Sequence, residues 1–177
     1  MANEALVKNG TPIVWANSGD YSSTGSGYTR THQMNPGGLG SDQAWQGVKA
    51  DLGATRARVY AVYACVSFDS SPTAGGIVEV WWSESADATA GVGNTGGASG
   101  TDLGYTPDYE EWKEQLRRIG ALAVTADNGV AERQFIGFLY PQQRYGMPII
   151  INIANTDFTT DGIERYIAIV PLINEVQ

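Results

Sequence analysis

Two strongly β-prone runs joined by a short polar connection, residues 56–82, constrain the fold of this 177-residue chain more than any other stretch. In the first run, residues 58–68, apolar and aromatic side chains occupy both alternating sets of positions. Successive side chains of a strand point to opposite faces, so this pattern predicts a central strand that is covered on both sides. Residues 77–82 form a second run of the same kind. The connection between the runs, residues 69–76, contains one proline and two glycines, which favour a turn.

Six further segments are strand candidates, because each is rich in apolar residues and lies between turn-forming residues. They are residues 12–16, 44–52, 120–126, 130–140, 147–154 and 163–173. The sequence Asp127-Asn128-Gly129 lies between two of these segments and is a strong signal for a hairpin turn. Together with the two central runs, these segments give about eight short strands.

One helix is expected, over residues 106–118. Thr106 suits the N-cap position and Pro107 suits the first turn. Glu114 lies four residues before Arg118, which is the spacing of an ion pair on a helix. Short strands with one helix among them predict a mainly β chain, an antiparallel β-sandwich with one short α-helix and an extended N-terminal arm. A jelly roll is the expected arrangement of the strands.

The N-terminal part of the chain differs in composition from the rest. Residues 17–43 are rich in Gly, Ser, Thr and Asn and show no periodicity, which is unusual inside a compact domain. We therefore predict an N-terminal arm and loop over residues 1–43, followed by a β-sandwich domain over residues 44–177. Three side chains of the arm are candidate interface residues that a partner would order: Tyr21, Tyr28 and Met34. A solvated loop with no role is the alternative.

Two classes of partner are not expected, nucleic acids because of the charge balance and membranes because the apolar stretches are short. The formal net charge is −8, with 11 Lys and Arg residues against 19 Asp and Glu residues. Binding to nucleic acid needs clustered basic side chains that replace phosphate counterions, and the chain has no such cluster. The N-terminus lacks a basic region followed by an apolar run, and the longest apolar stretches are too short to span a bilayer. We therefore expect no signal peptide, and neither a nucleic acid nor a membrane as partner.

The sequence offers no recognisable catalytic or metal-binding constellation. His32 is the only histidine and Cys65 the only cysteine, too few for a zinc cluster or, without a Gly-x-Ser-x-Gly elbow, for a Ser-His-Asp triad. Asp157 and Asp161 lack the spacing of a calcium-binding loop, and a turn with local hydrogen bonds is the simpler interpretation. Three glutamates fit a solvated helix face better than a pair of catalytic acids: Glu110, Glu111 and Glu114. We expect no catalytic residues, no metal and no cofactor, and therefore a protein that is not an enzyme.

Residues 83–104 form a glycine-rich loop whose role the sequence leaves open. The loop lacks the Gly-Lys-Ser/Thr ending and the strand-to-helix setting of a phosphate-binding loop. Two interpretations remain, a flexible lid over a site or a surface tip that touches a neighbouring subunit.

Five tryptophans raise the alternative of a carbohydrate-binding protein, which would display aromatic rings on an exposed face. Trp81 and Trp82 are adjacent in a predicted strand, so at most one of them can face a ligand. Trp15, Trp45 and Trp112 fall within apolar patterns. Core packing therefore explains most of the tryptophans.

Four features of residues 48–177 together resemble small virion proteins of tailed bacteriophages. They are the PTAGG turn that leads into an aromatic strand, the ATAGVGNTGGASG loop, the RYG turn before an aliphatic strand, and the terminal strand PLINEVQ. The polar residues 17–43 lie outside the similarity. These features are structural rather than catalytic.

The resemblance implies a structural component of a phage virion that is assembled in the host cytoplasm. We expect a capsid decoration or cement protein that binds across capsomers of the major capsid protein and stabilises the shell. Only 17% of the residues are charged and 22 are glycine, which suits a protein that packs against neighbours. A homo-oligomer is expected, with a trimer as its state, and the contact elements would be residues 1–11, 17–43 and 83–104.

Two alternatives stay open at this point. The chain could belong to the tail or baseplate of a virion and have a tail protein as its partner. It could also be a carbohydrate-binding module that contacts the host surface through exposed aromatic side chains.

Overall fold

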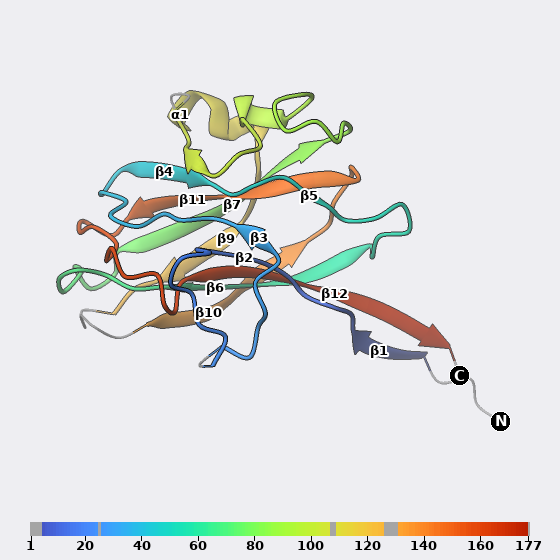
Figure 1. The fold of residues 1–177 in the computed structure, drawn as a ribbon, viewed down its shortest axis with the longest axis horizontal. Coiled ribbons are helices and arrows are strands. Elements are labelled where there is room, and N and C mark those ends of the chain that lie inside the picture. The colour runs from blue at the N-terminus through green and yellow to red at the C-terminus, as the bar shows by residue number, and fades with distance from the viewer. Residues whose placement is uncertain (1–4, 25, 107–108, 126–130, 177) are drawn as a thin grey trace.

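The computed structural model describes residues 5–24, 26–106, 109–125 and 131–176. Within these ranges, twelve strands form two six-stranded sheets that face each other across one core (Figure 1). The predicted mainly β class is confirmed, and the pairing is almost entirely antiparallel.

Each sheet contains strands from the beginning, middle and end of the chain. Sheet A has the order β10-β6-β12-β2-β3 with β1 attached to β12, and contains β1 (Ala5–Asn9), β2 (Ile13–Ala16), β3 (His32–Gln33), β6 (Val59–Val66), β10 (Glu132–Leu139) and β12 (Tyr166–Val176). Sheet B has the order β8-β4-β11-β7-β9 with β5 attached to β11, and contains β4 (Gln43–Gln46), β5 (Ala50–Asp51), β7 (Ile77–Ser85), β8 (Leu103–Gly104), β9 (Arg117–Ala123) and β11 (Tyr145–Ile153).

The first half of the chain pairs with the second half in reverse order. β2 pairs with β12, β4 with β11, β6 with β10 and β7 with β9, each time antiparallel. These four pairs alternate between sheet A and sheet B. The chain is therefore one long antiparallel double strand that wraps around the core.

The two runs that dominate the sequence become central strands. β6 lies between β10 and β12, and β7 lies between β11 and β9. On β6, Tyr60 faces the core and Cys65 faces the outside of sheet A, yet each is only 1% exposed. The prediction of a central strand covered on both faces is confirmed. Several large side chains fill the space between the sheets: Trp15, Trp82, Leu139, Ile150 and Phe158.

The predicted helix over residues 106–118 is wrong beyond Gln115. The described part is one turn of α-helix, α1 (Tyr109–Trp112), followed by the 3₁₀ helix η2 (Lys113–Gln115). Leu116 is extended, with φ −94° and ψ 157°, and β9 begins at the next residue. Arg118 does not pair with Glu114 but with Glu79 of the neighbouring β7, at 3.0 Å. Residues 117–123 thus place their backbone hydrogen bonds in the ladder with β7 instead of in a further helical turn.

The predicted hairpin around residues 127–129 does not form a hydrogen-bonded pair. Its turn lies outside the described residues, and its two arms belong to different sheets, β9 pairing with β7 and β10 with β6. The arms still meet, because Gly120 of β9 and Gly137 of β10 allow close approach of the backbones. A Cβ atom on Gly120 would lie only 2.3 Å from the carbonyl oxygen of Ile136.

Part of the predicted N-terminal arm packs onto the sandwich. β2 lies between β12 and β3, and its Trp15 is fully buried and donates its indole N–H to the carbonyl oxygen of Val48 at 2.7 Å. Met34 is 3% exposed and belongs to the core between the sheets. The division of the chain at residue 43 stays a prediction. The structure adds that Trp15 and Met34, which precede residue 43, belong to the hydrophobic core.

The outer face of sheet B is covered by the chain between β7 and β9, at the top of Figure 1. This layer includes the predicted glycine-rich loop, and it buries an apolar cluster that contains Trp81, Ala98, Tyr105, Leu116 and Met147. Lys49 fastens the loop, because its ammonium group donates to the carbonyl oxygens of Asp87, Thr89 and Val92 at 2.6–3.0 Å. These bonds make the loop a fixed cover of the sheet.

Candidate interaction surface

The outer face of sheet A is only partly covered by the chain. Near β2, an apolar cluster contains Val14, Ala16, Cys65, Tyr166 and Ala168, and the loop of residues 17–31 lies over it. The loop is pinned to β2 where Val14 donates its N–H to Thr31 Oγ1 at 2.8 Å. Towards β10 this cover ends, and the outer side chains of the sheet become exposed.

Two tyrosines of the covering loop are linked to each other and pack against the apolar cluster of the sheet. The Tyr21 hydroxyl donates to the carbonyl oxygen of Tyr28 at 3.0 Å and lies 2.6 Å from Ser26 Oγ. Burial raises the pKa of Tyr21 and Tyr28, and raises the pKa of Tyr166 beneath them to about 12. All three side chains therefore stay neutral over the physiological pH range and pack as aromatic rings.

Six aromatic rings form a continuous row across the outer face of sheet A, which we call the aromatic row. Its members are Tyr21, Tyr166, Tyr28, Tyr63, Phe135 and Phe138, in that order, with neighbouring ring centroids 5.1–6.3 Å apart. Edge-to-face and tilted arrangements of this kind are favourable for aromatic pairs. The row joins the covered end of the face to its bare end.

The bare end of the row is exposed because of a bulge in β10. The register shifts between Phe135, which lies opposite Tyr63, and Gly137, so that Phe138 comes to lie opposite Ala61. Residues three apart in a regular strand point to opposite faces, but the bulge puts Phe135 and Phe138 on the same outer face. They are 49% and 47% exposed, and the nearby Tyr140 is 50% exposed.

The chain termini form a second exposed element, which we call the terminal ribbon. It consists of β1 and residues 172–176 of β12, paired antiparallel, and it projects from the body of the sandwich (Figure 1). Three apolar side chains of the ribbon are exposed: Leu6, Val7 and Ile173. β6 accompanies β12 only as far as Leu172, which lies opposite Val59.

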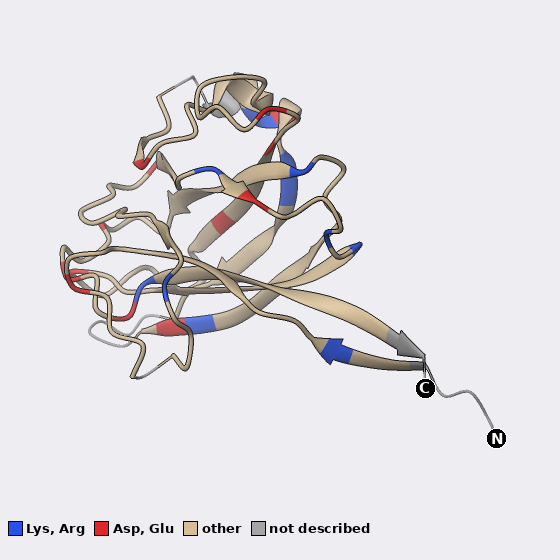
Figure 2. Ribbon diagram, turned by 45° about the vertical axis from the view of Figure 1, so that its right-hand side comes forward, with Lys and Arg blue, Asp and Glu red and all other residues tan. Residues whose placement is uncertain are grey.

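A groove of about 690 Å³ lies where the ribbon leaves the body. Its lining includes Val7, Arg56, Arg58, Phe138, Tyr140 and Ile173, so it joins the ribbon to the exposed end of the aromatic row. Arg56 is held in place by donating to the carbonyl oxygen of Gln142 at 2.7 Å. Basic segments lie beside the ribbon in Figure 2, while many acidic segments lie on the loops at the opposite end. This end of an acidic protein is thus locally basic.

The three predicted interface residues do not come together on one surface. Tyr21 and Tyr28 are partly buried at the covered end of the aromatic row, and Met34 is buried between the sheets. Sequence reasoning did not single out Phe135 and Phe138. The signal that could have found them is Gly137 inside a predicted strand, because an isolated glycine there indicates a bulge.

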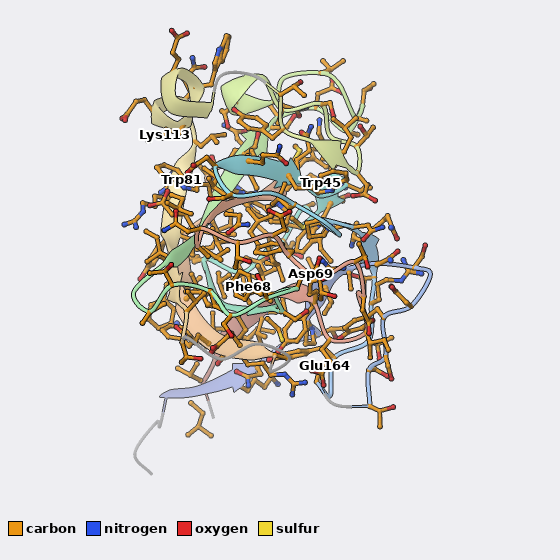
Figure 3. The ribbon with its side chains drawn as sticks, turned by 90° about the vertical axis from the view of Figure 1, so that its left-hand side faces the viewer. Trp45, Phe68, Asp69, Trp81, Lys113 and Glu164 are labelled. Atoms are coloured by element: carbon orange, nitrogen blue, oxygen red, sulfur yellow. The ribbon has the colours of Figure 1, made fainter. Side chains whose placement is uncertain are left out.

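The tryptophans lie mainly in packed positions, as the sequence predicts. Trp81 and Trp82 point to opposite faces of sheet B, with Trp82 in the core and Trp81 in the outer cluster below the helical turn that carries Lys113 (Figure 3). Trp45 donates its indole N–H to Asp102 at 2.7 Å. Trp112 is the exception, at 39% exposed.

The residues weighed for chemistry lie in structural roles. His32 packs against the Trp15 ring, with centroids 5.3 Å apart, and its Nδ1 lies 2.9 Å from Thr31 Oγ1. Asp161 accepts a hydrogen bond from the N–H of Ile163 at 3.0 Å, as in a local turn. In the described ranges, no group of three or more His, Cys, Asp or Glu side chains is placed to hold a metal ion.

None of the helices in the part of the chain that the structure describes is long and apolar enough to cross a membrane. No protein-family model, curated protein or solved structure gives a significant match to this chain. The exposed surface and the sequence resemblance are therefore the two indications of function.

Proposed function

We propose that this protein is a structural, non-enzymatic component of a tailed-phage virion, most specifically a capsid decoration or cement protein. In this role it binds across capsomers of the major capsid protein and stabilises the shell. The resemblance of residues 48–177 to small virion proteins supports this family, and the exposed end of the aromatic row is the observation that supports the binding role. The largest exposed apolar patch of a soluble protein is often functional, which supports a binding role for these rings.

The strand pairing supports a jelly-roll arrangement for this component. A jelly roll has eight antiparallel strands in two sheets. Eight of the strands, β2, β4, β6, β7, β9, β10, β11 and β12, form four nested antiparallel pairs that alternate between the sheets. The terminal ribbon then extends the outermost pair.

The size of the exposed patch indicates binding through several copies. Covering the exposed half of one aromatic ring gains roughly 2.5 kcal/mol, taking about 100 Å² at about 25 cal/mol per Å². Phe135, Phe138 and Tyr140 together give roughly 7 kcal/mol, which is close to the cost of about 4–15 kcal/mol for association. One patch is therefore a weak contact. A homo-oligomer on a repeating shell would make several such contacts at once. Selective binding to the assembled shell would stabilise the shell.

A carbohydrate-binding module remains the second candidate, because exposed aromatic rings also bind sugars. The geometry favours it less, since the Phe135 and Phe138 rings are at 67° to each other. Such rings do not form the flat platform on which a sugar ring stacks. Titration with host glycans would test this alternative, and loss of glycan binding in Phe135→Ser/Phe138→Ser would place the sugar at these rings.

Labelling of purified virions with antibody against this chain tests the proposal. Label spread over the head is expected, whereas label confined to the tail would favour a tail or baseplate protein instead.

A second measurement tests whether the aromatic row is the contact surface. The double variant Phe135→Ser/Phe138→Ser is added to particles from which this protein has been removed. We expect at least a tenfold loss of binding, with Ile163→Ser, another exposed apolar site at 45% exposure, as the matched control. Unchanged binding of the double variant would reject the aromatic row as the contact.

A further inference from the structure

We infer that the groove at the base of the terminal ribbon binds a short acidic segment of a partner protein, one that carries apolar side chains between its carboxylates. This binding role does not depend on the proposed virion function. The groove and the aromatic row share only Phe138, so the two surfaces can be tested separately.

Exposed apolar side chains gather around the groove from distant parts of the chain. Val7 comes from β1, Phe138 from β10 and Ile173 from β12. Tyr140, just after β10, is the fourth. These four side chains are 40–65% exposed. A segment that enters the groove can therefore bury apolar surface on several sides at once.

The groove also holds positive charge that the chain does not neutralise. Arg58 is exposed, and its guanidinium forms no hydrogen bond or ion pair with any residue in the described ranges. Arg56 donates to the carbonyl oxygen of Gln142, which is a neutral acceptor. The described lining contains no Asp or Glu, and Asp51, which precedes it in the chain, already pairs with Arg144 at 2.6 Å. Two arginine charges thus remain available to carboxylates from another molecule.

Charge and shape together select the occupant. Arginine and tyrosine are enriched among the residues that contribute most to protein interfaces, and the lining supplies both beside apolar surface. The complementary ligand carries negative charge and apolar side chains. A groove of about 690 Å³ has the size of a small-molecule site, so it admits a few side chains of a loop or an extended segment instead of a folded domain.

Other occupants fit this combination less well. Two copies that met through this end would bring like charges together. A nucleic acid is a long polyanion and would extend from the groove over a protein whose net charge is −8. An anionic bilayer is a broad surface that binds protruding apolar faces, not concave ones.

Fluorescence anisotropy with a labelled peptide tests the inference on the full chain. The probe is a peptide in which glutamate alternates with leucine and phenylalanine, and its matched control has lysine in place of every glutamate. We expect the acidic peptide to bind with a dissociation constant below about 100 µM and the lysine peptide not to bind. Raising the ionic strength from about 0.05 to about 0.5 M should weaken binding severalfold, because salt screens exposed charges.

Two variants assign the binding to the groove. Arg58→Glu replaces attraction by repulsion and should weaken binding of the acidic peptide at least about fivefold. Arg30→Glu makes the same charge change at an exposed site outside the lining and should bind normally. Tyr140→Ser removes an exposed ring and should weaken binding roughly tenfold, with Ile163→Ser as its control. Both substituted groove residues are exposed, so the melting temperature should not change.

Several results would each overturn the inference. They are absence of acidic peptide binding up to about 1 mM, equal binding of the lysine peptide, and equal binding by Arg58→Glu and the unsubstituted protein. Tighter binding of a single-stranded oligonucleotide or of anionic lipid vesicles, lost in Arg58→Glu, would assign the groove to that ligand instead. Self-association of the protein that disappears in Arg58→Glu would assign it to a second copy.

Discussion

The two outer faces of the sandwich are both apolar, but the chain covers them to different extents. Over sheet B, the chain between β7 and β9 forms a layer that buries Trp81, Tyr105 and Leu116. Over sheet A, residues 17–31 cover the end near β2 and leave Phe135 and Phe138 about half exposed. The chain thus covers the apolar outer face of sheet B and leaves part of the apolar outer face of sheet A exposed. The bare end is where the fold leaves room for another molecule.

The largest expected effect concerns the complete cover. Leu116 is 8% exposed and joins the layer to the outer cluster of sheet B. Replacing it by alanine should lower the free energy of unfolding by about 2–4 kcal/mol, because the lost methyl groups leave a cavity. Urea unfolding measures this loss, with Leu103→Ala at a site 39% exposed as the control. Equal effects of the two variants would mean that the layer is not part of the core structure.

An intermediate effect is expected for the partial cover of sheet A. Tyr28 contacts the rings of Tyr63 and Tyr166, with centroids 6.3 and 5.4 Å away. Tyr28→Ala should cost about 1–2 kcal/mol and speed hydrogen exchange in residues 17–31, because half of the loop's aromatic attachment is removed. Tyr28→Phe keeps the ring and should behave as the unsubstituted protein. A loss as large as that of Leu116→Ala would remove the difference between the two covers.

The fold was predictable where the signal is local. Residues 58–68 and 77–82 are apolar on both faces, and this alone identified β6 and β7 as central strands. The predicted helix extends too far because Glu114 and Arg118 have the spacing of an ion pair on a helix, while the pairing of residues 117–123 with β7 depends on a distant strand. A non-local partner decided between two structures that the local pattern allows.

The candidate surface was less predictable for the same reason. Alternation along β10 places Phe135 and Phe138 on opposite faces, and only the bulge at Gly137 reverses this. The terminal ribbon depends on where β6 stops relative to β12, a relation between residues 59 and 172. Nothing in the local sequence of either strand carries that information.

The smallest expected effect is a pH dependence at the edge of sheet A. His32 on β3 packs against Trp15, and burial, followed by the charge of Arg30, lowers its pKa from the ordinary value of 6.5. The unfolded chain therefore binds a proton more readily than the folded one, so the contribution is complete above the unfolded pKa and is lost as the pH falls below it. The free energy of unfolding should decrease slightly between about pH 7.5 and about pH 5.5.

His32→Gln isolates this contribution, because a neutral amide replaces the ring that titrates. The variant should show a smaller decrease over the same pH interval in urea unfolding. Arg30→Gln keeps the histidine and removes the lesser of the two causes of its lowered pKa, so it should reduce the decrease less than His32→Gln does. An equal decrease in His32→Gln and the unsubstituted protein would assign the pH dependence to carboxylates elsewhere. In that case the edge at β3 would be insensitive to pH, and the difference between the two faces would rest on their covers alone.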